Sequence, residues 1–142
     1  MAPDDATLRT LLRQTRTIAL VGHSHKPHRA SYQIAAFLRD AGYRVYPVNP
    51  VLSTIDGELC YPTLNAIPDS IDLVNVFRRS EFLPEIAEAA IAIGAKMFWA
   101  QLGIQDDATA QRLTAAGITP IMDRCIKIEY LRLGLTPSPE AP

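Results

Sequence analysis

The stretch Thr17-Ile-Ala-Leu-Val-Gly-His-Ser-His-Lys-Pro-His-Arg-Ala-Ser31 joins a short apolar run to a glycine and then to a polar, cationic loop. A helical pattern follows over residues 30–41, with Ile34 and Leu38 on one face and Gly42 as its end. A strand, a glycine-initiated loop and a helix in this order are typical of the first unit of a parallel α/β sheet.

The same alternation continues along the chain. Strand-length apolar runs recur at 44–48, 71–77, 95–100 and 118–122, and helical patterns occupy 80–93 and 105–116. Gly42, Gly94 and Gly117 each follow a helix and precede a strand. Because crossovers between parallel strands are right-handed, helices must cover both faces of the sheet. We therefore expect an α/β, Rossmann-like three-layer fold with a mainly parallel five-stranded sheet and helices on both faces.

The remaining segments are less regular. We expect further helices at 5–15 and 124–133, and Ser80 is a suitable N-cap for the helix at 80–93. Residues 51–70 contain Asp56-Gly57 and two prolines, which favour a turn, a short helix and a connector over a full helix. We expect one domain over residues 1–135, followed by a Pro-rich flexible tail at 136–142.

Composition limits the function classes. The 142 residues are 48% apolar and 20% charged, as in ordinary globular proteins, and the net charge of −1 gives no global field for nucleic acid. No apolar run approaches the roughly 20 residues of a membrane helix, and the polar, acidic start lacks the pattern of a signal peptide. We expect a cytoplasmic protein that binds neither nucleic acid nor membrane.

Cysteine and histidine give no clear metal or catalytic site. Two widely spaced cysteines argue against a zinc site or a disulfide framework. His23, His25 and His28 are close in sequence, but no Cys or acidic residue nearby completes a metal shell, so we predict no metal. Cys125 follows Arg124 at a helix start, where a thiol is either reactive or simply packed, and we favour packing. We predict no catalytic residue.

Ligands of open parallel sheets bind beyond the carboxyl ends of the strands. The loop after residues 17–21 leads into a helix N-terminus and carries Lys26 and Arg29, a combination suited to a phosphate. It is not the dinucleotide fingerprint, because Ser24 and Pro27 replace the second and third glycines. A polar connector with solvated charges is the alternative.

The end of the second strand argues against NAD. An acidic residue there holds the ribose hydroxyl in dinucleotide-binding proteins, whereas this chain reads Val48-Asn49-Pro50. Arg78 and Arg79 follow the third strand, and arginine suits bidentate contact with phosphate. Cations at a helix start oppose the helix dipole, so this pair favours a nearby anion.

Taken together, these motifs resemble those of the small single-domain CoA-binding proteins, whose fold is similar to the CoA-binding domain of the succinyl-CoA synthetase alpha subunit. The resemblance covers nearly the whole chain in order. It rests on Ile18-Ala-Leu-Val-Gly22, Ser24-His-Lys-Pro27, Arg29, Ser31, Gly42-Tyr43, Tyr46-Pro-Val-Asn-Pro50, Gly57, Tyr61-Pro62, Ile67-Pro68, Val76-Phe-Arg78, Gly94-Ala-Lys96, Trp99-Ala-Gln101, Asp123-Arg-Cys125, Glu129 and Arg132.

The resemblance implies coenzyme A as the ligand and assigns residues to it. The loop should approach the phosphates, and we include in it Gly22, His23, Ser24, His25, Lys26, Pro27, His28, Arg29 and Ser31. The nucleotide part should lie against Asn49 and Pro50, the adenosine and its phosphates beside Phe77 and Arg78, and the cleft floor near Trp99, Ala100 and Gln101. The residue after Gly22 is often small in this family and here is His23.

Four functions therefore remain under comparison. The first is binding of CoA or an acyl-CoA in the crevice at the strand ends, without catalysis. The second is an NAD(P)-binding oxidoreductase-like domain, and the third is a subunit of an acyl-CoA synthetase that acts with partner chains not identified by the sequence. A purely structural interaction role is a fourth, weaker alternative.

Overall fold

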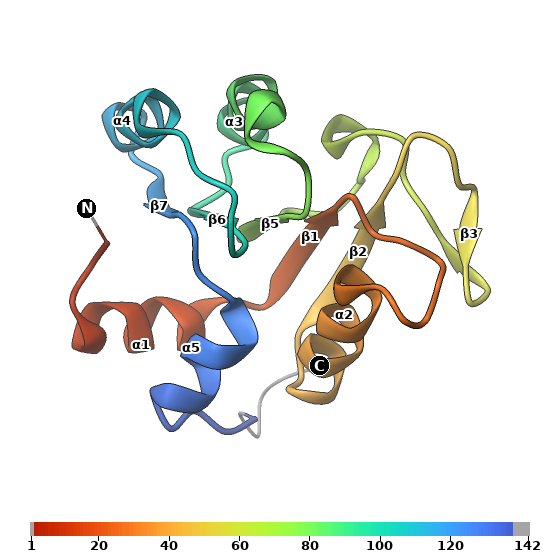
Figure 1. Cartoon of the computed structure of the whole chain (residues 1–142), viewed down its shortest axis with the longest axis horizontal. Helices are drawn as coiled ribbons and strands as arrows, with labels where there is room; N and C mark the ends of the chain where they lie inside the picture. Colours follow the sequence, from red (N-terminus) through yellow and green to blue (C-terminus); the bar gives the residue numbers. More distant parts are fainter. Residues whose placement is uncertain (1, 138–142) are drawn as a thin grey trace.

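The central element of the computed structural model, which describes residues 2–137, is a five-stranded sheet in the order β2-β1-β5-β6-β7. All of its neighbouring strands run parallel. The strands are β1 (Thr17–Val21), β2 (Arg44–Val48), β5 (Leu73–Val76), β6 (Met97–Ala100) and β7 (Thr119–Ile121). The predicted fold class and all five predicted strands are confirmed (Figure 1).

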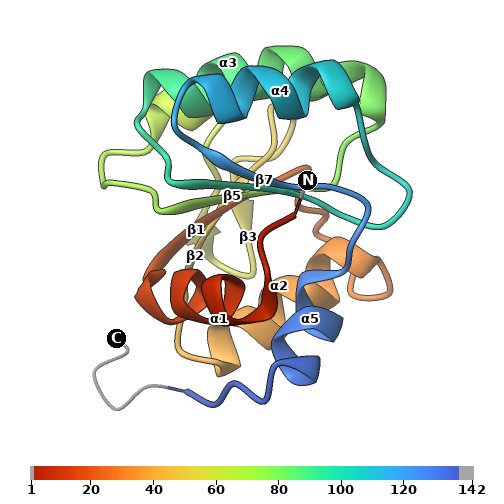
Figure 2. The same cartoon turned by 90° about the vertical axis from the view of Figure 1, so that its left-hand side faces the viewer.

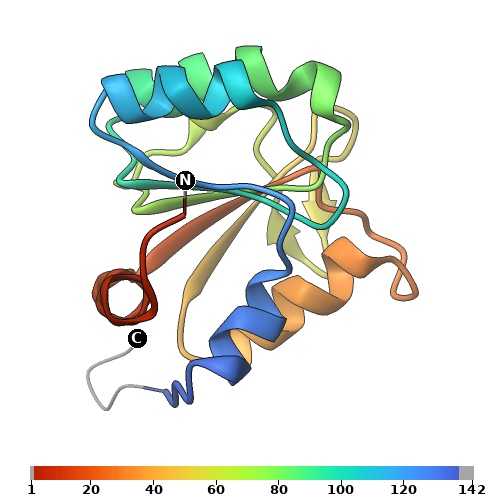
Figure 3. The same ribbon diagram turned by 60° about the vertical axis from the view of Figure 1, so that its left-hand side comes forward.

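Helices cover both faces of this sheet, as the right-handed crossover rule requires. Helices α3 (Leu83–Ala92) and α4 (Asp107–Ala115) lie on one face, and α1 (Asp5–Gln14), α2 (Ala30–Asp40) and α5 (Ile126–Arg132) lie on the other (Figures 2 and 3). The core is split accordingly: Ala19 and Val21 pack toward α3, whereas Ile18 and Leu20 pack toward α1 and α2. Alternate residues of a strand point to opposite faces, and the apolar residues on both faces are buried because helices cover both sides of the sheet.

The order in which successive strands join the sheet reverses at β1, because β2 and β5 lie on opposite sides of it. From β1 it passes through α2 to β2 at the sheet edge, and it then returns to place β5 on the other side of β1. The helices after β1 and after β5 consequently lie on opposite faces, and their starts diverge at this point. A sheet of this kind binds ligands in the crevice that opens there.

The glycine-terminated helices are confirmed, with positive φ angles at Gly42, Gly94 and Gly117. The prediction that Ser80 caps the helix at 80–93 is wrong. A 3-10 turn, η2 (Ser80–Phe82), precedes α3, and Phe82 occupies the cap position without a side-chain hydrogen bond. Pro84 lacks an amide N–H and has its φ preset for a first helical turn, so α3 begins beside it without a cap. The Ser80 hydroxyl instead accepts the Gln105 N–H at 3.0 Å.

The connector after β2 contains the expected turn and short helix, η1 (Leu64–Ala66). It also contains a small antiparallel hairpin of β3 (Thr54–Ile55) and β4 (Glu58–Leu59) that we did not predict. Asp56 and Gly57 both have positive φ, of 50° and 80°, which is the conformation of a two-residue hairpin turn.

Two further predictions concern the C-terminal tail and the lack of a membrane-spanning helix. The tail at 136–142, predicted to be flexible, lies mostly outside the described residues. Within residues 2–137, none of the helices has the length and apolarity to cross a bilayer.

Candidate functional site

The end of β1 is shaped by Gly22. Its φ is +89°, and a Cβ placed there would lie 2.7 Å from the carbonyl oxygen of Phe77 at the end of β5. The Gly22 N–H donates to the Val48 carbonyl of β2 at 2.9 Å. The loop therefore leaves the sheet between β2 and β5, through a gap that only a residue without a side chain can occupy.

Two serines give the following loop its shape. The Ser24 N–H donates to the Ser31 hydroxyl at 3.0 Å, and the Lys26 N–H donates to the Ser24 hydroxyl at 3.0 Å. Ser31 is buried in the first turn of α2, so the loop is tied to the helix that follows it. The predicted residues Ser24 and Ser31 thus both line the site and position it.

Asn49, at the end of β2, connects the loop to the neighbouring strand. Its side-chain N–H donates to the His23 carbonyl at 3.0 Å, and its side-chain oxygen accepts the Val51 N–H at 2.9 Å. Both ends of the amide are therefore engaged within the protein. Asn49 lines the crevice, but its side-chain hydrogen bonds hold the protein backbone at His23 and Val51 in place.

Helix α2 presents an uncapped N-terminus to this loop. Arg29 occupies the cap position and makes no side-chain cap hydrogen bond, and the first turn carries no acidic residue. The first amide groups of a helix have no partner within the helix, and the dipole gives them partial positive charge. This arrangement can bind an anion through backbone N–H groups.

An open crevice of about 450 Å³ lies in front of that N-terminus. From the loop and α2 it is lined by Gly22, Ser24, His25, Lys26, Arg29 and Ser31, and from the strand ends by Asn49 and Phe77. These eight were all predicted as site residues. The lining includes two cationic side chains and no carboxylate, so its electrostatics favour a negatively charged ligand.

A second hollow, of about 240 Å³, lies across Gly22 on the α3 side of the sheet. The predicted residues Pro50 and Arg78 line it. The Arg78 guanidinium lies 4.3 Å from the centre of the Phe82 ring, a cation–π contact that restrains the side chain beside this hollow. The carboxylate of Glu85 also lines this hollow, so its lining carries one charge of each sign. Gly22 belongs to both hollows, so one extended ligand can reach both Lys26 and Arg78.

Three predicted residues of the loop lie elsewhere. Pro27 and His28 are exposed and line neither hollow, whereas the His23 side chain is fully buried. The imidazole therefore leaves the crevice open, and the bulk at this position is directed into the protein. Within residues 2–137 no group of three His, Cys, Asp or Glu side chains is arranged as a metal ion would require.

The residues expected near the cleft floor are buried and line neither hollow. Trp99 and Ala100 have no exposed surface, and the Trp99 indole N–H donates to the Arg124 carbonyl at 2.8 Å. The Gln101 side-chain oxygen accepts the Ile126 N–H at 3.1 Å, which caps α5, and also accepts from Asn75 at 3.1 Å. The hydrogen bonds of Trp99 and Gln101 therefore hold the start of α5 to β5 and β6.

The sequence analysis missed the apolar side of the crevice. Val51 and Leu52 line it, and the Val51 side chain is 86% exposed. An apolar pair directly after Asn49-Pro50 in an otherwise polar connector was the available signal. Exposed apolar side chains beside a cationic loop suit a ligand that carries both phosphate and apolar groups.

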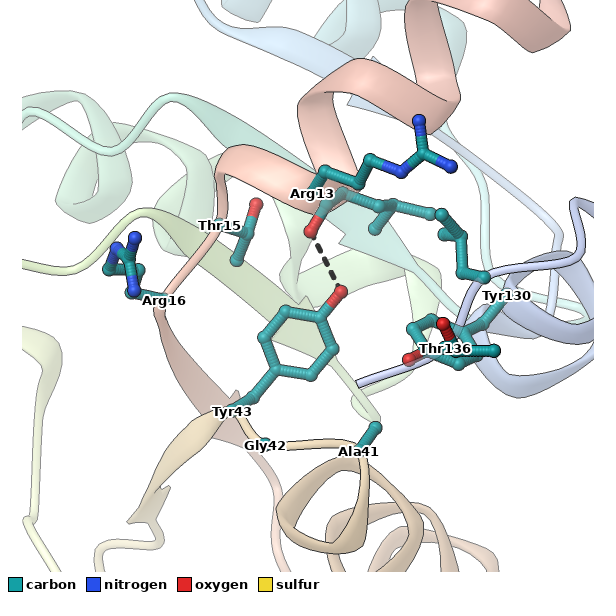
Figure 4. A pocket seen from close by; sticks show the side chains of 10 residues that line it. Arg13, Thr15, Arg16, Ala41, Gly42, Tyr43, Tyr130 and Thr136 are labelled. Atoms are coloured by element: carbon teal, nitrogen blue, oxygen red, sulfur yellow. Dashed lines mark hydrogen bonds between the residues drawn. The ribbon is translucent and has the colours of Figure 1, made fainter. Parts of the chain in front are cut away.

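A small cavity of about 40 Å³ lies at the opposite, amino end of the sheet, between α1, α2 and α5. Figure 4 shows Tyr43 and Tyr130 there, with the Tyr43 hydroxyl donating to the Leu12 carbonyl at 2.8 Å. Burial raises the pKa of Tyr43, so its hydroxyl stays neutral. The cavity is too small for a nucleotide, which leaves the carboxyl end of the sheet as the candidate site.

Comparison with known proteins agrees with this geometry. The model of the CoA binding domain family matches residues 16–131, and the chain therefore belongs to that family. It is 41% identical over 128 residues to the uncharacterized protein YneT of Bacillus subtilis, covering 90% of this chain and 95% of that protein. A hypothetical protein from Pyrococcus horikoshii has the same fold, with a TM-score of 0.89, 35% identity and 94% of each chain covered.

A larger enzyme contains a similar segment. The acetate–CoA ligase (ADP-forming) of Methanocaldococcus jannaschii is 28% identical over 81 residues, which are 57% of this chain and 12% of the ligase. The resemblance to the small CoA-binding proteins is confirmed by the family match, and the larger enzyme with a similar segment is this acetate–CoA ligase, where the resemblance named the succinyl-CoA synthetase alpha subunit.

Proposed function

We propose that this protein binds coenzyme A, or an acyl-CoA, in the crevice at the carboxyl ends of β1, β2 and β5, without catalysing a reaction of its own. The observation that carries the proposal is the uncapped, cationic N-terminus of α2 beside Gly22, in a chain of the CoA binding domain family. Residues 1–135 form the binding domain in this proposal.

The two hollows suit the two anionic parts of CoA. The pyrophosphate fits the backbone amides of the loop and α2 beside Lys26, and Arg78 can reach the 3′-phosphate or the pyrophosphate from the other side of Gly22. The apolar Val51 and Leu52 offer contact to the uncharged parts of the ligand. The crevice beside Lys26 has no carboxylate at the end of β2, where an acidic side chain holds the ribose hydroxyl groups in NAD-binding proteins, and this disfavours NAD.

The similarity to the acetate–CoA ligase favours a second candidate, in which this chain provides CoA to partner chains that form the acyl-CoA. The two candidates differ in one assay. Formation of acetyl-CoA from acetate, ATP and CoA by this chain alone would contradict the non-catalytic proposal. Activity that appears only with an added partner supports the second candidate.

Calorimetric titration tests the binding proposal. CoA should bind more tightly than NAD, and Arg78→Ala should weaken CoA by about one to two orders of magnitude, because a charge-assisted hydrogen bond contributes roughly 1.5–3 kcal/mol. Lys26→Ala should cost less, since the loop amides remain. Arg79→Ala is the matched control: its side chain is exposed, contacts Glu81 and lines neither hollow. Tighter binding of NAD than of CoA would contradict the proposal.

A further inference from the structure

His23 is the one fully buried histidine of the described chain, and it lies inside the loop that forms the crevice. Its Nδ1 atom is 2.7 Å from the Ser24 carbonyl oxygen. Because a carbonyl oxygen only accepts, Nδ1 carries the proton and Nε2 has a lone pair. Nε2 is buried and, among the described residues, has no hydrogen-bond partner.

The environment of the ring favours its neutral form. The ring packs edge-on against Tyr32 of α2, with centroids 6.1 Å apart. Burial is the largest influence and lowers the pKa of His23, and the hydrogen bond to the Ser24 carbonyl partly opposes it. Arg39 of α2 also lowers this pKa, whereas Asp56 and Glu58 of the hairpin raise it. Tyr32 donates a hydrogen bond to Asp56, which connects α2 with the hairpin turn across this histidine.

Protonation would place a cation and an unpaired N–H in this enclosed space. The Ser24 carbonyl would still accept from Nδ1–H, but the new Nε2–H would have no acceptor. A buried charge with an unpaired donor is unfavourable, so protonation favours movement of the ring out of this space. The backbone of His23 and Ser24 would move with it. That backbone receives the Asn49 side-chain N–H and donates to Ser31, the two contacts that fix the loop.

We propose that His23 is a positioning residue that makes the crevice sensitive to pH: the neutral imidazole holds the loop in its anion-binding shape, and protonation releases it. The identity of the ligand rests on the proposed function, whereas the behaviour of the loop does not. Since the folded protein disfavours the proton, the contribution of His23 is fully present above the ordinary histidine pKa of 6.5 and is lost as the pH falls below that value.

The sign of this effect sets His23 apart from the other two histidines. His25 and His28 are exposed on the same loop, where added positive charge would strengthen anion binding. Release of the loop by His23 should weaken it. The direction of the pH dependence therefore separates a positioning role from simple electrostatics.

Two variants isolate the residue. The double variant His25→Gln/His28→Gln retains His23 as the only histidine, because the chain has three. Adding His23→Asn gives a triple variant in which an amide N–H replaces the Nδ1–H donor and cannot take up a proton. CoA is titrated into both by calorimetry at about pH 7.5 and about pH 5.5. The ligand's own phosphate titration cancels in the ratio of the two Kd values.

We expect the Kd of the double variant, relative to the triple variant, to rise by about tenfold from the higher to the lower pH. A ratio that stays constant, or that falls in acid, would overturn the inference. Retained binding by the triple variant at the higher pH indicates that the Asn donor rescues the loop, and weakened binding by His23→Leu at the same pH supports the same role.

The ligand-free double variant gives an independent measurement. NMR follows the His23 ring signals and the amide protection factors of Ser24 and Lys26 across the same pH range. We expect protection at both amides to fall as the ring takes up its proton, and unchanged protection would overturn the inference. If the protein binds no CoA at about pH 7.5, the proposed function fails, and this measurement still decides the role of His23.

Discussion

At the residue scale, Gly22 brings β1, β2 and β5 together at one point. Its positive φ and its approach to the Phe77 carbonyl oxygen are separate requirements for glycine. The first excludes most side chains by backbone conformation, and the second excludes them by space. The sequence placed Gly22 at a strand end, but only the folded chain identifies the neighbour that it approaches.

We predict that Gly22→Ala destabilises the fold by roughly 2–4 kcal/mol, because the new methyl group meets backbone that cannot move without distorting β5. Gly103→Ala is the control. Gly103 also has a positive φ, of +80°, but nothing lies within 4 Å of a Cβ there, so it should lose only about 1–2 kcal/mol. Urea unfolding measures both variants. Equal losses would mean that the approach to Phe77 has no energetic consequence.

Asn49 permits a test of charge at the crevice. In Asn49→Asp, a carboxylate oxygen replaces the N–H that now donates to the His23 carbonyl, and it adds negative charge to a lining that has none. We predict that CoA binding weakens by about ten- to a hundredfold.

Asn49→Ala removes the same hydrogen bond without adding charge, and it also removes the acceptor of the Val51 N–H, which the Asp variant keeps. Despite this second loss, the Ala variant should weaken binding less if charge dominates. The difference in CoA affinity between the Asp and Ala variants should become smaller at high salt, because mobile ions screen the added charge. Calorimetry at two salt concentrations measures this. Identical affinities for the two variants would contradict an electrostatic role of the site.

At the scale of elements, α5 is held to the rest of the fold by charge. Glu129 is buried and accepts hydrogen bonds from Arg132 at 2.9 and 3.2 Å and from Arg124 at 3.2 Å. Arg132 also contacts Asp5 of α1 at 2.8 and 2.9 Å. These contacts connect the last helix to the first across more than a hundred residues of sequence.

Removing the charge of Glu129 tests this connection. The hydrogen bond from Arg132, followed by the positive charges of Arg132 and Arg124, lowers the pKa of Glu129 from its ordinary value of 4.5. The stabilisation is therefore present above pH 4.5 and is lost as the pH falls below it. We predict that Glu129→Gln costs about 1–2 kcal/mol at neutral pH, and that the difference from wild type shrinks below pH 4.5. Thermal unfolding that shows a constant difference into strong acid would contradict an ionic contact.

The elements were easier to predict than their connections. Five apolar runs and the glycines at 42, 94 and 117 are local signals, and the sheet and most of its helices follow from them. The predicted N-cap at Ser80 is wrong because its hydroxyl accepts a tertiary hydrogen bond from the Gln105 N–H instead. The β3–β4 hairpin was missed because each strand has only two residues, too few for a periodic pattern.

At the scale of the whole molecule, the strand order brings together three segments that are distant in sequence. The loop at 22–31, Asn49 with its apolar successors, and Phe77-Arg78 meet because β1 lies between β2 and β5. The sequence predicted these segments individually, from their positions after strands. It could not predict that Trp99, Ala100 and Gln101 are buried beneath the surface, because burial depends on how α5 packs over β6.

Titration of CoA into ¹⁵N-labelled protein, followed by amide NMR, tests the central claim most directly, because one experiment reports both binding and its place. We predict saturable shifts concentrated in residues 22–31, 49–52 and 77–78, with the amides around Tyr43 and Tyr130 at the opposite end of the sheet unchanged. An absence of saturable shifts, or shifts centred on the Tyr43–Tyr130 cavity, would contradict the account.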